Sequence, residues 1–200
     1  MTDYFALFNE PRRPCLDADA LKKKFHSLSV ELHPDKIHSA GSAEKDGAAR
    51  RYAELNSAFN CLRETPSRLR HLIELESGRK AVDLLQMPDD LADLFMEVGA
   101  LCRQVDAFLK EKAAVSSPLL LAQLFERGQS WVDQLQAVQR RINDRQAALR
   151  IRLQELDSEW MTEPTGGASL LPRLEEVWRL MSFYGRWSGQ LQERVAQLAM

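Results

Sequence analysis

Polar residues around a proline stand where a strong helical pattern breaks. The tetrapeptide His33-Pro34-Asp35-Lys36 places a titratable ring, a carboxylate and an amine within one short stretch. With His38 nearby, His33 and Asp35 offer donor types suited to a metal ion or an acid–base pair. Pro34 splays its two neighbours apart, and no third group is in place to orient them, which disfavours that chemistry. Two interpretations remain: helix caps, or a rigid loop carboxylate that can form a charge-assisted bond to an arginine.

Two amphipathic helices flank the tetrapeptide and would hold it at the tip of a hairpin. The upstream helix carries one apolar stripe and must end at His33, because Pro34 disfavours the α region for the residue before it. The downstream helix carries a second stripe and can begin near Ser42. Neither helix would be stable alone, so they should pack antiparallel. The two stripes are Leu21, Phe25, Leu28, Leu32 and Tyr52, Leu55, Phe59, Leu62.

A cationic face of the first helix leads to the same loop. The side chains that share this face lie about 100° from the apolar stripe on a helical wheel. Such a face suits docking on an acidic groove and would act mainly on the rate of encounter. A run of lysines is also typical of a merely solvated helix face, and this alternative stays open. The residues of the face are Lys22, His26, Ser29 and His33.

These segments resemble the J-domain family, the co-chaperones of DnaK-type 70-kDa heat-shock ATPases. The family's second helix and loop match LKKKFHSLSVELHPDK, and its third helix matches YAELNSAFNCL. The HscB subgroup, which serves iron–sulfur cluster assembly, is more specifically similar to the opening DYFALF and to ETPSRLRHLIEL. The resemblance implies that Asp35 engages an arginine of the chaperone and biases it toward ATP hydrolysis. The chaperone-binding residues it implies are Lys22, His26, His33, Pro34, Asp35, Lys36 and Asn56.

The second half of the chain predicts three long helices around one core. The first begins near Pro88, the second near Pro118, and the third follows a turn at Pro164-Thr165-Gly166-Gly167. Each carries apolar residues at 3/4 spacing, and the seam of the second includes Leu135 and Ile142. The stripe of the first is Leu91, Leu94, Phe95, Val98, Leu101, Val105 and Phe108. The expected fold is therefore all-α and L-shaped overall. It comprises a J-domain built on a helical hairpin over residues 1–77, a linker over 78–88 and an antiparallel three-helix bundle over 89–200. Within the first of these, the helical pattern continues from Arg63 to Ser77, with Leu69, Leu72, Ile73 and Leu75 apolar.

Met96 lies about 170° from the centre of the apolar stripe of its helix, among small residues. An exposed methionine suits an apolar partner, although a lone surface methionine is common. HscB-subgroup members use the head of this helix to hold the iron–sulfur scaffold protein, so the resemblance implies a client site. This chain departs from the subgroup's acidic pattern, with Gly99, Ala100 and Arg103, and only Glu97 clearly remains. The implied client-binding residues are Ala92, Met96, Glu97 and Phe183, with peripheral packing as the alternative for Phe183.

Composition excludes several function classes. The net charge of −2 over 200 residues argues against a nucleic-acid binder, which needs an excess of Lys and Arg. The three cysteines, Cys15, Cys61 and Cys102, are widely spaced and form no C-x-x-C pair, which predicts neither disulfides nor a zinc site. No apolar run approaches 18 residues, and no basic presequence precedes DYFALF. We therefore expect a cytoplasmic protein without membrane contact, metal or other cofactor.

The sequence thus predicts a co-chaperone rather than an enzyme. Its loop would stimulate the ATPase of a DnaK- or HscA-type chaperone, and its bundle would deliver a client, first of all an iron–sulfur scaffold protein. Two alternatives remain open: a J-domain co-chaperone for an unrelated client, and a helical adaptor with an idle loop that dimerises through its long seam. A hydrolytic or metal enzyme is disfavoured, because we find no nucleophile–base pair and no ligand spacing.

Overall fold

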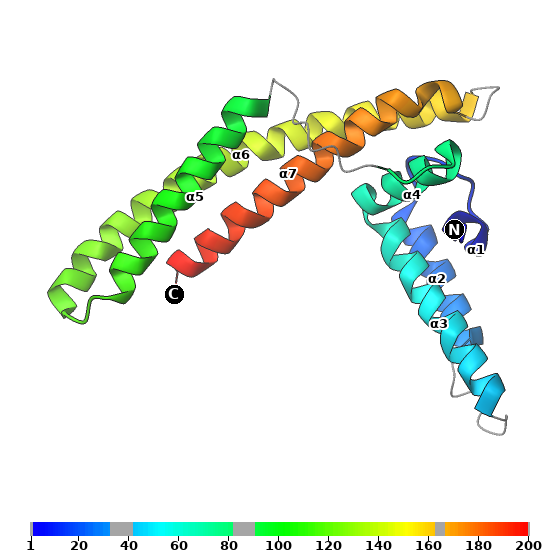
Figure 1. The fold of residues 1–200 in the computed structure, drawn as a ribbon, viewed down its shortest axis with the longest axis horizontal. Coiled ribbons are helices and arrows are strands. Elements are labelled where there is room, and N and C mark those ends of the chain that lie inside the picture. Colours follow the sequence, from blue (N-terminus) through cyan, green and yellow to red (C-terminus); the bar gives the residue numbers. More distant parts are fainter. Residues whose placement is uncertain (1, 33–41, 82–90, 163–166, 200) are drawn as a thin grey trace. The chain divides into compact units, whose positions relative to one another are not determined.

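The computed structural model describes residues 2–32, 42–81, 91–162 and 167–199, and the regular structure within these ranges is entirely helical (Figure 1). The all-α prediction is confirmed. In chain order the helices are α1 (Tyr4–Leu7), α2 (Ala18–Leu32), α3 (Ser42–Arg63), α4 (Thr65–Ser77), α5 (Ala92–Ala113), α6 (Pro118–Thr162), the short 3-10 helix η3 (Ala168–Leu170) and α7 (Leu171–Leu198).

Packing divides the chain into two compact units, and α6 and α7 contribute to both. The first unit comprises Met1–Val82 and Ile151–Trp178, and the second comprises Asp83–Arg150 and Arg179–Met200. The predicted linker over 78–88 lies in part outside the described residues, as does the predicted start of a helix at Pro88.

In the first unit, α2 and α3 pack together as the predicted hairpin, and α1 packs against α3. The ring of Phe25 stacks on that of Phe59 with centroids 4.1 Å apart. Leu21 and Leu55 are fully buried beneath them, as is Phe5 of α1. Asp3 caps the start of α1, because its carboxylate accepts hydrogen bonds from the backbone N–H groups of Phe5 and Ala6. The apolar stripes thus form a shared core, as the periodicity predicts.

A break separates α3 from α4, where the sequence pattern predicts one continuous helical segment from Arg63 to Ser77. Glu64 has an extended backbone, and Pro66 occupies the first turn of α4, so the chain turns and starts a new helix. α4 ends at Gly78, whose φ of +67° is the left-handed conformation that glycine adopts without strain. Its predicted apolar face is buried at Leu69, Leu72 and Ile73.

Arg68 of α4 is a buried cation that satisfies backbone carbonyls from two other segments. Its Nε donates to the Pro14 carbonyl at 2.8 Å, and its Nη1 donates to the Leu62 carbonyl at 2.7 Å. Its Nη2 also donates to Thr65 Oγ1 at 3.3 Å. Only 6% of the residue is exposed, and this burial lowers the pKa of the guanidinium from its usual value. Arg68 thereby ties α4 to the end of α3 and to the segment that precedes α2.

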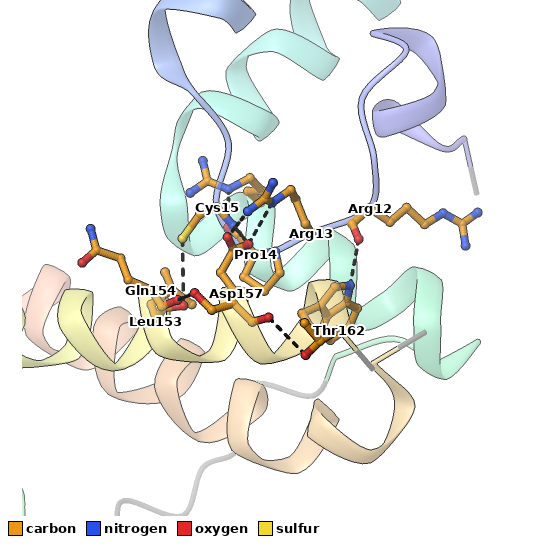
Figure 2. Close-up of polar contacts among 11 residues, drawn as sticks. Arg12, Arg13, Pro14, Cys15, Leu153, Gln154, Asp157 and Thr162 are labelled. Atoms are coloured by element: carbon orange, nitrogen blue, oxygen red, sulfur yellow. Dashed lines mark hydrogen bonds and ion pairs between the residues drawn. The ribbon is translucent and has the colours of Figure 1, made fainter. Parts of the chain in front are cut away.

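That preceding segment, residues 12–15, has no secondary structure and is held from its other side by α6. Arg13 forms a bidentate ion pair with the buried Asp157, and the Cys15 N–H donates to the same carboxylate at 2.9 Å (Figure 2). Trp160 Nε1 donates to the Arg12 carbonyl at 2.8 Å. We call residues 12–15 the strap. Its polar backbone groups are satisfied by side chains of α4 and α6 instead of by a helix or sheet.

His71 of α4 holds the opening helix in place. Its Nε2 accepts a hydrogen bond from the Tyr4 N–H at 3.1 Å, and its ring stacks on the Tyr4 ring with centroids 4.6 Å apart. The residue is 5% exposed, and burial is the main reason that its pKa is lowered from the ordinary value. The neutral imidazole is therefore the form that the fold requires.

The second unit is built from α5 and the adjoining parts of α6 and α7. Ion pairs from Glu97 to Arg141 and from Glu111 to Arg127 join α5 to α6 and show that the two helices run antiparallel. Arg194 of α7 pairs with Asp106 of α5 at 2.8 Å. The residues of the predicted seam of α6, such as Leu135 and Ile142, are fully buried within the chain. This burial disfavours the alternative in which that seam mediates dimerisation.

One residue of the predicted α5 core stripe is not buried. Leu91, Leu94 and the later stripe residues are buried, whereas Phe95 is 46% exposed. The Phe95 ring contacts the Trp187 ring of α7, with 6.3 Å between their centroids. The apolar stripe is thus wider than the face that α7 covers. Within the described ranges, none of the helices combines the length and apolarity needed to cross a bilayer.

Replacing Arg68 with methionine should destabilise the chain by roughly 2–4 kcal/mol, because two buried carbonyls lose their donor. Arg70→Met on the same helix is the matched control, since Arg70 is exposed and its ion pair with Glu74 spans one turn. We expect the control to change the free energy of unfolding by less than about 0.5 kcal/mol. Urea unfolding followed by circular dichroism measures both, and equal losses would contradict the structural role of Arg68.

The lowered pKa of His71 predicts that stability falls as the pH falls. Between the folded-state pKa and the unfolded value, about 6.5, the unfolded chain binds more protons, so the contribution is present above pH 6.5 and is lost below it. His71→Gln keeps an acceptor for the Tyr4 N–H and does not titrate. Urea midpoints at pH 7.5 and 5.5 should therefore differ less in the variant than in the wild type, and an unchanged difference would refute the assignment.

Candidate functional site

The tetrapeptide predicted to contact a chaperone lies outside the described residues. This applies to His33, Pro34, Asp35 and Lys36, and also to His38, so their roles remain predictions. The structure describes the helices on either side. α2 ends at Leu32, one residue before His33, and α3 begins at Ser42, as predicted. Because α2 packs on α3, the two helices frame the segment that contains Asp35.

The predicted cationic face is partly formed by the described residues of α2. Lys22 and His26 are both exposed and lie four residues apart, which places them on one face. Lys24 is turned elsewhere: its Nζ pairs with Glu10 at 2.7 Å and donates to the Asn9 carbonyl at 3.1 Å. The side-chain oxygen of Ser29 is buried and makes no hydrogen bond within the described structure. The cationic face is therefore narrower than the lysine run implies.

Asn56, also predicted to contact the chaperone, is half-buried on α3. Its Nδ2 donates to the Tyr52 carbonyl one turn earlier, at 2.8 Å. This bond leaves the amide oxygen and the second N–H of Asn56 available to a partner.

The residues predicted to contact a client lie on α5 and α7 of the second unit. Met96 is 62% exposed on α5, and Ala92 begins the same helix one turn earlier. The ring of Phe183 lies 5.9 Å from that of Trp187, and Trp187 in turn contacts Phe95. We call Phe95, Met96 and Phe183 the Met96 patch. Trp187 of α7 contacts both Phe95 and Phe183 and so connects α5 with α7. Sequence reasoning missed this residue, although its place in the 3/4 spacing of α7 could have indicated that it is buried.

The charges around the Met96 patch differ from the acidic surface that the resemblance implies. Glu97 is engaged by Arg141 of α6, whose Nη1 lies 2.6 and 2.9 Å from the two carboxylate oxygens. The Arg186 guanidinium stacks over the Phe183 ring at 4.8 Å. Arg103 lies back along α5, and a Cβ atom at Gly99 would sit 3.5 Å from its Nη1. The patch is therefore apolar, with cations beside it. Sequence reasoning did not identify Arg141, because this residue lies 44 positions from Glu97 in the chain.

A polar cavity of about 480 Å³ in the first unit offers residue types that can do chemistry, including Cys61 and His71. Burial raises the pKa of the Cys61 thiol to about 11, so it is not a nucleophile at neutral pH. The His71 lone pair already accepts the Tyr4 N–H, which removes it as a general base. Among the described residues, no three metal-binding side chains cluster. The cavity does not support an enzymatic site.

By sequence, the chain is similar to a co-chaperone over part of its length. No model of a known protein family matches the chain. The chain is 37% identical over 81 residues to the co-chaperone protein HscB homolog of Azoarcus sp. strain BH72. The match covers 40% of the chain and 46% of that relative, so the chain spans about half the length of the curated relative it matches.

Solved structures extend the likeness to nearly the whole chain. The chaperone HscB from Vibrio cholerae matches with a TM-score of 0.64 and 20% identity, over 98% of this chain and 99% of that one. The human co-chaperone protein HscB matches with a TM-score of 0.61 and 15% identity, over 96% of this chain and 82% of that one. At these identities the likeness establishes the fold. Together with the sequence match, this fold bears out the predicted resemblance to HscB-type co-chaperones.

Proposed function

We propose that the chain is a J-type co-chaperone in iron–sulfur cluster assembly. Its loop at residues 33–36 stimulates the ATPase of a DnaK- or HscA-type 70-kDa chaperone, and its second unit delivers an iron–sulfur scaffold protein. The observation that carries the proposal is the packed α2–α3 hairpin. Its first helix ends at Leu32 and its second begins at Ser42, so the residues between them include Asp35. The sequence match to a co-chaperone supports it. In this role the chain regulates the ATPase of its partner.

Stimulation depends on a carboxylate that meets an arginine of the chaperone. Pro34 restricts the backbone beside Asp35, so little conformational freedom is lost when a charge-assisted hydrogen bond forms. Such a bond is worth about 1.5–3 kcal/mol. It promotes hydrolysis to the extent that it is stronger in the hydrolysis-competent state of the chaperone. Lys22 and His26 extend the contact along α2 and mainly raise the rate of encounter.

Client binding rests on the Met96 patch. Met96 and Phe95 expose apolar surface on a rigid helix, and Phe183 extends that surface onto α7. A methionine adapts its shape to an apolar partner at little strain. Ala92, one turn before Met96, leaves the surface open because its side chain is small.

The second candidate is a J-type co-chaperone for an unrelated client. The observation that favours it is the charge of the patch: Glu97 is paired within the chain, and Arg186 lies against Phe183. A scaffold that needs several acidic partners would find few here. This alternative keeps the same loop mechanism and differs only in what the second unit carries.

Asp35→Asn should reduce stimulation of the chaperone ATPase by roughly tenfold or more, because the amide cannot form the charge-assisted bond. Asp46→Asn is the matched control: it removes an exposed carboxylate from the same hairpin and should stimulate normally. Steady-state ATP hydrolysis by the purified chaperone, with circular dichroism to verify helical content, measures both. Full stimulation by the Asp35 variant would sink the proposed mechanism.

Met96→Glu should weaken scaffold binding by at least about tenfold, because the interface would have to bury an unpaired charge. Met161→Glu is the control, since Met161 is similarly exposed, at 54% against 62%, but lies on α6 away from the patch residues in the chain. A pull-down with the purified scaffold compares the three proteins. Failure of the wild type to retain any scaffold would favour the unrelated client.

A further inference from the structure

The carboxylate of Glu97 faces two competing uses. It lies directly after Met96 in sequence, where a partner on the Met96 patch can reach it. Within the chain it is held by Arg141 at 2.6 and 2.9 Å. Both side chains are accessible, with 41% of Glu97 and 53% of Arg141 exposed. The Glu97–Arg141 pair therefore lies at the surface, where water or a charged group of a partner can replace either member of the pair.

A groove beside the pair gives a partner side chain a place to enter. It holds about 340 Å³ between α5 and α6. Small side chains, Ala100 and Ala137, keep it open, and Leu101 and Val138 give it an apolar floor. The Glu97–Arg141 pair closes one end of this groove. A partner that extends from Met96 into the groove therefore meets the ion pair.

The charges around the groove favour a basic group on the partner. Asp93 is exposed and lies four residues before Glu97, so the two carboxylates share a face of α5. Gln104 and Gln134 are the polar side chains deeper in the groove, and they carry no charge. Asp93 and Glu97 thus give this face of α5 two carboxylates, and Arg141 pairs with the second of them. The opposite edge of the patch has the other sign, because Arg186 covers Phe183, so the basic group belongs at the α6 edge.

We propose that Arg141 is a selectivity residue: it competes with a basic residue of the client for Glu97 and thereby lowers the affinity of the Met96 patch for apolar segments that carry a cation. This inference rests on the client half of the proposed function. Exposed ion pairs are weak and exchange readily, so Arg141 tunes binding without blocking it. A client that has an apolar anchor for Met96 but no cation leaves the Glu97–Arg141 pair intact, so Arg141 reduces the advantage that a cation-bearing client would otherwise have.

The test measures the affinity of the full chain for the purified iron–sulfur scaffold protein of the same host by calorimetry at low salt. Arg141→Gln should bind roughly two- to fivefold more tightly than the wild type, the range expected for one exposed ion pair. Arg140→Gln is the matched control, since Arg140 is an exposed neighbour that does not contact Glu97 in the structure. In a Glu97→Gln background, Arg141→Gln should have no effect, because nothing remains to compete for.

Three results would overturn the inference. Equal affinity of Arg141→Gln and the wild type would show that the pair does not compete with the client. Weaker binding by Arg141→Gln would show that Arg141 itself contacts an acidic group of the client. Absence of scaffold binding by the wild type and by Arg141→Gln alike would remove the client half of the proposed function together with this inference, whereas stimulation of the chaperone ATPase reports on the loop alone.

Discussion

Two buried charged side chains hold a segment that has no secondary structure, and the first unit depends on them. The strap carries backbone polar groups into the interior, and such groups must find partners there. Arg68 supplies a donor to the Pro14 carbonyl. Asp157 accepts from the Cys15 N–H while it pairs with Arg13 (Figure 2). α4 and α6 are thereby fixed against the same four residues. Trp160 completes the arrangement by donating to Arg12, and its ring leaves no room for a side chain at Gly167, where a Cβ atom would approach within 2.5 Å.

The surface proposed to bind a partner in each unit lies on helices, and its charges are local. The net charge of −2 provides no long-range attraction for an anionic or a cationic partner. Electrostatic recognition therefore depends on a few residues: Lys22 and His26 on α2, and the Glu97–Arg141 pair beside the Met96 patch. In both places the chain already uses nearby charges for itself, through Lys24 with Glu10 and Arg141 with Glu97. Internal pairing narrows what each surface presents to a partner.

Helical periodicity predicted most of the fold, because long apolar stripes leave little choice of structure. This periodicity predicted where α2 ends and where α3 begins on either side of the tetrapeptide. It also predicted the exposure of Met96 and the three long helices. It failed at Glu64, where Pro66 starts a new helix, and at Phe95, which belongs to the stripe but lies beyond the face that α7 covers. It could not predict Arg13 with Asp157 or Glu97 with Arg141, since 144 and 44 residues separate the partners and no local pattern links them. The candidate site was predicted mainly from the resemblance, and its charges required the fold.

The central claim is that two separate surfaces bind two different proteins. Site-specific photo-crosslinking tests it most directly, with a photoreactive residue at His26 on α2 or at Met96 on α5, in the presence of both the 70-kDa chaperone with ATP and the scaffold protein. The account predicts a crosslink to the chaperone from position 26 and to the scaffold from position 96. A crosslink to the chaperone from position 96, with none from position 26, would contradict it.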